Sequence, residues 1–312
     1  MSNLLTVKNI FKTYQKANKK AVSNVSFEVN SGDIVAFLGP NGAGKTSTLK
    51  MILNLISPDQ GQIFFQGQDV THKNLPLLKN TGVLLEGSKN MFWSLSPIEN
   101  FIYWGGQRGL NKKEATEKGL FLLKRFNLLV KKDTVITKLS RGMQQIIGIC
   151  CAMIAHPQLL ILDEPTLGLY LASTKIMTNM LKQLASHGIG ILVTTHQLDF
   201  AQKVANKILL INHGQLVFSG NVKASLARLN QRTVFEVQFS RKITTAEKEK
   251  VMSYCKVTAK NENTYYLSIK KTQYLSMLLS LLSKLPVETI ETKTRDLSDI
   301  FEYYMGYKNE KF

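Results

Sequence analysis

Mostly apolar runs recur along the first two thirds of this 312-residue chain. The clearest lie at residues 33–38, 159–162 and 188–196. Short runs of this kind are typical of parallel strands that are buried on both faces. Residues 46–56 instead repeat their apolar side chains at helical spacing. We therefore predict an α/β fold in this part of the chain.

After about residue 220 the pattern changes. Thr244 and Glu247 have the spacing of a capping box, which would open a helix over residues 244–255. A second, amphipathic helix is predicted over residues 273–285. Strand patterns lie at residues 233–239, 256–259, 264–269 and 287–292. We therefore divide the chain into a domain of residues 1–220 and a compact α+β domain, ferredoxin-like in its order of elements, of residues 221–312.

The composition restricts where the protein works. Its longest apolar run, residues 146–155, is shorter than the roughly 18 residues that cross a bilayer, and charges interrupt every apolar stretch near the N-terminus. Cys150, Cys151 and Cys255 have no metal-ligand spacing and suit a reducing compartment. We expect a cytosolic protein that does not span the membrane.

The formal net charge of +18 is compatible with nucleic acid, an anionic lipid surface or phosphorylated ligands. The lysines and arginines are scattered along the chain and form no block. Charge alone therefore does not choose among these partners.

Residues 39–47, GPNGAGKTS, lie between a predicted strand and a predicted helix. This is the context of a phosphate-binding loop, in which backbone N–H groups and the positive end of the helix face one anion. A glycine turn without a ligand is the alternative. The expected nucleotide-binding residues are Gly39, Pro40, Asn41, Gly42, Ala43, Gly44, Lys45, Thr46 and Ser47. Lys45 would reach the outer phosphates of ATP, Thr46 would hold Mg²⁺, and Ser47 would hold the inner phosphate.

Two further strands are expected to end beside this loop, because parallel strands present their carboxyl ends at one edge of the sheet. The strand of residues 159–162 leads into Asp163 and Glu164, and the strand of residues 188–196 ends in His196. We expect Asp163 to bind Mg²⁺ and Glu164 to deprotonate the attacking water. His196 is expected to act on the terminal phosphate, with Lys45 completing the catalytic set. Capping and other structural roles are the alternatives for these side chains.

Residues 139–145, LSRGMQQ, lie shortly before the strand that ends in Asp163. With the phosphate-binding loop, this motif resembles the signature of the ATP-binding subunits of ABC transporters, and the resemblance covers nearly all of residues 1–220. It implies a P-loop ATPase domain of the ABC type, with a mixed sheet and a helical subdomain at about residues 87–157. It also implies that the signature contacts ATP held by the opposite subunit of a dimer. The residues implied for that contact are Ser140, Arg141, Gly142 and Gln144.

Three other positions gain a meaning from the resemblance. Tyr14 would stack on the adenine ring, unless it is an ordinary tyrosine at a strand edge. Glu86 stands where most of the family has a glutamine; it would bind Mg²⁺, and the substitution resembles the ABC-2-type exporter branch, although an ordinary solvated carboxylate is the alternative. Tyr170 stands where the family has an aspartate at the dimer interface, which leaves open how the two sites communicate.

Aromatic residues gather between residues 87 and 110, including both tryptophans, Trp93 and Trp104. The resemblance implies that this region receives the membrane subunit, and internal packing is the alternative. A regulatory or dimer-supporting role for residues 221–312 is likewise implied only by resemblance.

Two functions remain. The first is an ATPase that powers an ABC transporter, with a lean to ABC-2-type export, by ATP-driven dimerisation against a separate polytopic permease subunit. The second is a soluble ABC ATPase that acts on ribosomes or nucleic acid. The chain has one set of motifs, no heptad run and no metal-spaced cysteines, so we expect the first function, no nucleic-acid partner and a peripheral position at the cytoplasmic face of the membrane. A homodimer and a heterodimer both remain open.

Overall fold

The computed structural model describes residues 2–15, 19–73, 75–86, 91–230, 233–269 and 274–306. They form two compact units, the first built mainly from Met1–Val222 and the second mainly from Lys223–Tyr303. Each unit has its own hydrophobic core. Within the described ranges, no helix combines the length and the apolar character needed to cross a membrane.

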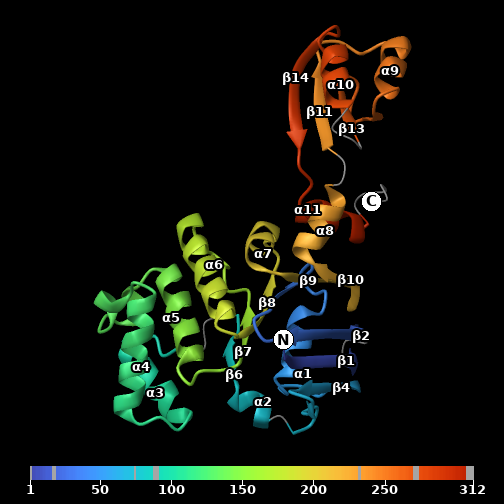
Figure 1. Cartoon of the computed structure of the whole chain (residues 1–312). Coiled ribbons are helices and arrows are strands. Elements are labelled where there is room, and N and C mark those ends of the chain that lie inside the picture. Colours follow the sequence, from blue (N-terminus) through green and yellow to red (C-terminus); the bar gives the residue numbers. More distant parts are fainter. Residues whose placement is uncertain are drawn as a thin grey trace. The chain divides into compact units, whose positions relative to one another are not determined.

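A six-stranded sheet lies at the centre of the first unit (Figure 1). Its order is β10-β9-β3-β8-β7-β6, in which β10 runs antiparallel to β9 and the other neighbours are parallel. Strands β3, β7 and β8 are buried along their whole length, which explains their uninterrupted apolar sequences. The bounds are β3 Ile34–Leu38, β6 Thr81–Leu84, β7 Leu159–Asp163, β8 Gly190–Thr195, β9 Lys207–Asn212 and β10 Gln215–Asn221.

A second, antiparallel sheet of the first unit has the order β2-β1-β4-β5. It packs against the central sheet through a shared core, in which the ring centroids of Phe27 and Phe37 are 5.8 Å apart. The bounds are β1 Asn3–Tyr14, β2 Lys19–Asn30, β4 Gln60–Phe65 and β5 Gln68–Asp69.

Helices α3, α4 and α5 gather at one end of the first unit, away from β1, β2 and β4 (Figure 1). Capping boxes begin α3 at Ser96 and α4 at Asn111. A Cβ on Gly119 would lie 2.3 Å from the Phe101 ring, so glycine allows α3 and α4 to pack closely. The helices of this unit are α1 Lys45–Ile52, α2 Leu75–Lys79, α3 Pro97–Gln107, α4 Lys112–Arg125, α5 Arg141–Met153, α6 Leu171–Ser186 and α7 Leu198–Val204, with short 3-10 turns at Leu129–Lys131 and Ile136–Lys138.

Arg108, just after α3, joins these helices to the central sheet. Its guanidinium donates hydrogen bonds to the carbonyls of Leu78 at 2.7 Å, Lys79 at 3.2 Å and Thr81 at 3.0 Å. These carbonyls belong to the end of α2 and the first residue of β6. One side chain therefore satisfies the turn through which the chain enters the sheet.

The second unit is a four-stranded antiparallel sheet of order β12-β13-β11-β14, with a core that includes residues of α9 and α10. Along the chain its elements follow the order β-α-β-β-α-β. Thr244 and Glu247 form the predicted capping box at the start of α9, which confirms that prediction. The bounds are β11 Thr233–Phe239, α9 Thr245–Met252, β12 Lys256–Ala259, β13 Thr264–Ile269, α10 Leu275–Leu282 and β14 Val287–Lys293. Helices α8, Val222–Leu229, and α11, Leu297–Tyr304, precede and follow this sequence of elements.

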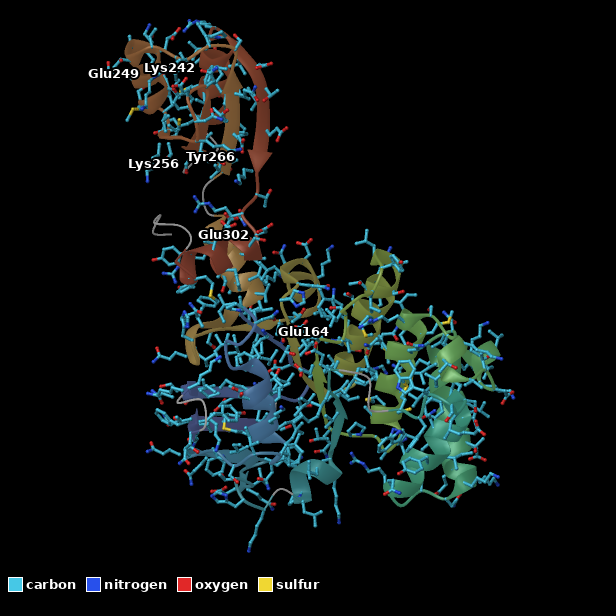
Figure 2. All side chains as sticks on the ribbon, turned by 180° about the vertical axis from the view of Figure 1, so that it is seen from behind. Glu164, Lys242, Glu249, Lys256, Tyr266 and Glu302 are labelled. Atoms are coloured by element: carbon cyan, nitrogen blue, oxygen red, sulfur yellow. The ribbon has the colours of Figure 1, made fainter. Side chains whose placement is uncertain are left out.

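Tyr266 of β13, labelled in Figure 2, lies in a polar group of side chains on this sheet. The ammonium of Lys293 is 4.8 Å and that of Lys260 is 5.8 Å from its ring centroid. Lys260 also pairs with Glu236, which faces Tyr266 across the strands. These contacts are those of a solvated sheet face, as expected for an antiparallel sheet with one covered side.

Candidate active site

The loop between β3 and α1 requires glycine at several positions. Gly42 and Gly44 have φ angles of +77° and +114°, in the region that favours glycine. A Cβ on Gly39 would lie 2.3 Å from the carbonyl oxygen of Ile211 in β9. The loop therefore curls tightly against the sheet, and α1 begins directly after it at Lys45. This arrangement turns backbone N–H groups and a helix N-terminus toward one point.

Lys45 is buried inside the loop. Its ammonium donates hydrogen bonds to the carbonyl oxygens of Gly39 at 2.7 Å and Pro40 at 3.1 Å. Burial lowers the pKa of Lys45, and the nearby carboxylates of Glu164, Asp163 and Glu86 oppose that shift. The loop carbonyls therefore hold the ammonium beside the position where a phosphate would bind.

Asp163, the last residue of β7, is almost fully buried and faces the start of α1. Its Oδ1 accepts a hydrogen bond from the Thr194 hydroxyl, and the Thr46 hydroxyl is 3.5 Å from its Oδ2. Glu86, two residues after β6, lines the same pocket. In the described part of the chain, no group of three or more His, Cys, Asp or Glu side chains is arranged to hold a metal ion. The hydroxyl and carboxylate oxygens instead fit a hard cation that takes few protein ligands and binds substrate phosphate.

Glu164 follows Asp163 with a φ of +48°, which is uncommon for a residue other than glycine. Its N–H donates to both the carbonyl and the hydroxyl of Thr194 at 3.1 Å, which fixes the backbone in this conformation. The side chain is only 8% exposed. His196 Nδ1 lies 3.0 Å from Oε2, but the pair is not aligned as a hydrogen bond, and Oε2 accepts none from the described residues. A buried carboxylate oxygen without a donor can accept a proton.

Tyr14 lies at the opposite side of the loop, at the end of β1. Its hydroxyl is 3.3 Å from that of Ser47, and its side chain is partly exposed. The contact places an aromatic ring beside the first turn of α1. A flat ligand could stack on this ring while its charged end occupies the loop.

These side chains surround one pocket of about 510 Å³. Figure 2 labels Glu164, which directly follows the last residue of β7 and lines this pocket. The predicted residues that line the pocket are Tyr14, Asn41, Gly42, Gly44, Lys45, Thr46, Ser47, Glu86, Asp163, Glu164 and His196. Gly39, Pro40 and Ala43 belong to the loop but not to the lining. Lys19, Ala21 and Leu167 line the pocket as well and were missed by the sequence reasoning.

The four predicted signature residues lie elsewhere in the chain and do not line this pocket. Ser140 caps α5 by accepting from the Met143 N–H, and Arg141 donates to the carbonyl of Leu167 at 3.1 Å. A Cβ on Gly142 would lie 2.4 Å from the Ser173 hydroxyl. Gln144 donates to the carbonyls of Ile136 and Leu139, both at 3.0 Å, so its amide is committed to the preceding turn. Within one chain, these residues form the start of α5 and leave the pocket open.

Comparisons with known proteins agree with this geometry. The family described as "ABC transporter" matches residues 22–167. The ABC transporter ATP-binding protein NatA of Bacillus subtilis (strain 168) is 31% identical over 223 residues, which cover 71% of this chain and 91% of NatA. The chain belongs to the ATP-binding proteins of ABC transporters. It is accordingly an ATP-binding ATPase subunit.

Two further comparisons of this ABC ATPase with known proteins concern its length and its fold. The linearmycin resistance ATP-binding protein LnrL of Bacillus subtilis (strain 168) is 28% identical over 310 residues, which cover 90% of this chain and 99% of LnrL. A solved structure of an ATP-binding subunit of an ABC transporter is 27% identical and has a TM-score of 0.64, covering 73% of this chain and 93% of the other. Because it covers 90% of the chain, the similarity to LnrL extends into the second unit.

Tyr170 and Leu171, at the start of α6, are among the most exposed large apolar side chains of the described residues. Their side chains are 87% and 89% exposed. Tyr170 occupies the N-cap position of α6 without supplying a side-chain hydrogen bond to the helix. A short polar residue at this position would satisfy a free N–H group there.

Proposed function

We propose that two copies of this chain, or one copy and a close relative, bind ATP with Mg²⁺ between them and power an ABC-2-type exporter. The signature residues Ser140, Arg141, Gly142 and Gln144 of one chain would complete the pocket of the other. This explains why α5 presents a capped helix start that does not reach the pocket of its own chain. The site is then a property of the pair of chains.

Several residues of the pocket would bind the triphosphate. The N–H groups of residues 39–47 would surround the inner phosphates, and the Lys45 ammonium would turn from the loop carbonyls to the outer ones. Thr46, Asp163 and Glu86 would hold the cation, which when bound neutralises charge on the outer phosphates. Tyr14 would stack on the adenine ring.

The observation that carries the proposed hydrolysis is the Oε2 atom of Glu164. It is buried, accepts no hydrogen bond from the described residues and lies 3.0 Å from Nδ1 of His196. A water molecule beside the terminal phosphate could donate a proton to this oxygen and attack phosphorus as the bond to the leaving oxygen breaks. His196 would orient Glu164 and the terminal phosphate.

The ATPase assay tests this assignment. Purified Glu164→Gln protein should lose turnover by about 100-fold or more, because an amide cannot take the proton, while ATP affinity changes little. Glu291→Gln, which alters an exposed carboxylate of β14, serves as the matched control and should keep wild-type turnover. Equal turnover in Glu164→Gln and wild type would remove Glu164 from the mechanism.

A membrane permease subunit is the proposed partner, and an aromatic cluster of the first unit is the proposed docking surface. The ring centroids of Phe92 and Tyr103 are 4.5 Å apart, and those of Tyr103 and Trp104 are 5.1 Å apart. Phe92 and Tyr103 are both more than 40% exposed, whereas Trp104 Nε1 is buried without an acceptor among the described residues. The exposed rings of Phe92 and Tyr103 suit a protein partner, which would cover them on docking. Residues 87–90, the start of the docking region predicted at residues 87–110, lie outside the described residues.

Copurification from detergent-solubilised membranes tests the docking surface. Tyr103→Ala should reduce recovery of a polytopic membrane protein, because it removes an exposed aromatic anchor. Phe121→Ala changes another exposed aromatic of the helical part and should keep full recovery. Recovery of ribosomal material in place of a polytopic protein would favour the second candidate, a soluble ABC ATPase, for which the net charge of +18 is the supporting observation.

Export rather than import rests on two observations. Glu86, in place of the usual glutamine, resembles the ABC-2-type branch, and LnrL, whose match covers 90% of this chain, is named for resistance to linearmycin. The proposed location is peripheral, at the cytoplasmic face of the membrane. The second unit, about residues 221–312, is proposed as an accessory or regulatory domain, and the similarity to LnrL extends into it.

A further inference from the structure

Lys19, the first residue of β2, brings a second ammonium group to the nucleotide pocket. It lines the pocket together with Tyr14 and Lys45. Its Nζ lies 3.6 Å from the position that a Cβ on Gly42 would occupy. The ammonium is therefore beside the middle of the phosphate-binding loop.

The pairing of β1 with β2 determines this position. Tyr14 and Lys19 are directly opposite each other in the register of the two antiparallel strands. Residues that face each other in this way extend their side chains on the same side of the sheet. Because the Tyr14 hydroxyl contacts Ser47, the same strand ends bring Lys19 to the loop. Lys20, the next residue, instead places its ammonium 5.9 Å from the ring centroid of Phe11.

The charges in the pocket leave Lys19 available for a ligand. Among the described residues, its ammonium makes no salt bridge and no hydrogen bond. The ammonium of Lys45, by contrast, is held by loop carbonyls and lies near three carboxylates. An exposed ammonium beside a loop that binds phosphate is placed to pair with a phosphate oxygen.

We infer that Lys19 binds the phosphate chain of the nucleotide on the side that faces Tyr14. Lys19 thus lies beside both Tyr14, which would bind adenine, and the loop that would bind the phosphates. It contacts phosphates that ATP and ADP share. The inference rests on the proposed function, because it takes this pocket as the nucleotide site. It adds a binding residue that no signature motif contains.

Equilibrium binding of ATP and ADP to the purified full chain tests the inference. Lys19→Ala should weaken both nucleotides by about fivefold at low salt, and Lys19→Arg should restore most of the affinity. The difference from wild type should shrink as ionic strength rises, because salt screens an exposed charge pair. Lys20→Ala is the matched control, since it removes the neighbouring lysine that points elsewhere, and it should bind like wild type.

The outcomes separate this inference from the site on which it depends. Lys45→Ala should abolish binding; if it does not, the site assignment fails, and the inference with it. If Lys45→Ala abolishes binding while Lys19→Ala binds both nucleotides like wild type, only the inference fails. It also fails if Lys20→Ala has the same effect as Lys19→Ala, or if the loss in Lys19→Ala is independent of salt.

Discussion

His196 Nδ1 and Glu164 Oε2 are 3.0 Å apart, although the His196 side chain is 47% exposed and the Glu164 side chain only 8%. The contact links the ends of β8 and β7, two neighbouring parallel strands. It leaves Oε2 without an aligned donor, so histidine can hold the carboxylate in place without occupying its proton-accepting position.

Replacing His196 should therefore reduce turnover without greatly changing ATP affinity. For His196→Ala we expect kcat to fall by about 10- to 100-fold, because Glu164 loses the side chain that orients it. Steady-state ATPase assays give kcat, and equilibrium binding gives Kd. Exposed His72 offers a matched control, and His72→Ala should retain wild-type kcat. A large loss of affinity in His196→Ala with unchanged kcat would contradict the assigned role.

Acid should destabilise the protein partly through Asp33. Burial alone would raise the pKa of this carboxyl group, but hydrogen bonds from Lys207 at 2.6 Å and Asn206 at 2.9 Å lower it overall. A lowered folded-state pKa contributes stability above the unfolded pKa of about 3.9, and that stability is lost as pH falls through the folded value. In urea unfolding at neutral pH, Asp33→Asn should lower the free energy of unfolding by about 1–3 kcal/mol relative to wild type. This difference from wild type should become smaller below pH 4.

The exposed pair of Asp59 and Lys12 is the control for this experiment. Its atoms are 2.7 Å apart, yet the carboxylate is largely solvated, so Asp59→Asn should cost less than about 1 kcal/mol. If the difference in unfolding free energy between Asp33→Asn and wild type stays constant from pH 7 to pH 3, the ion pair is excluded as its cause.

Two helical glycines should respond oppositely to alanine. In Gly119→Ala the new Cβ would meet the Phe101 ring at 2.3 Å, so we expect a loss of about 1–3 kcal/mol in unfolding free energy. Nothing lies within 4 Å of the corresponding atom on Gly106, inside α3, so Gly106→Ala should stabilise by up to about 1 kcal/mol. Thermal unfolding of both variants gives the comparison. Equal effects of the two substitutions would show that α3 and α4 do not pack as described.

Tyr170→Asp should stabilise the first unit, because the N-cap of α6 has no side-chain acceptor. An aspartate there can accept from a free N–H group and is favoured by the helix dipole, which together contribute about 0.5–2 kcal/mol. Tyr170→Ala supplies no acceptor and is the control. The prediction fails if the two variants unfold at the same temperature.

The local motifs predicted the centre of the site because each follows a strand of one parallel sheet. Lys45, Asp163, Glu164 and His196 come from three stretches far apart in the sequence, and the ends of β3, β7 and β8 bring them to one pocket. Their chemical roles stay predictions.

Other positions depend on geometry that the motifs do not encode. Lys19 reaches the pocket through the register of β1 and β2, and a shift of one residue would have placed Lys20 there instead. The direction of the Gln144 amide depends on the carbonyls of the turn before α5. The signal that could have found Lys19 was its nearness in the sequence to Tyr14, a residue already assigned to the nucleotide.

The three hydrogen bonds of Arg108 connect the four-residue strand β6, and the turn before it, to the end of α3. One end of this strand is tied to α3 through the carbonyl of Thr81, and Glu86 follows the other end into the pocket. A displacement of Glu86 by a ligand would pass along β6 to Thr81 and, through its hydrogen bond, to Arg108. Arg108 would then pass a shift at the edge of the nucleotide pocket on to the end of α3.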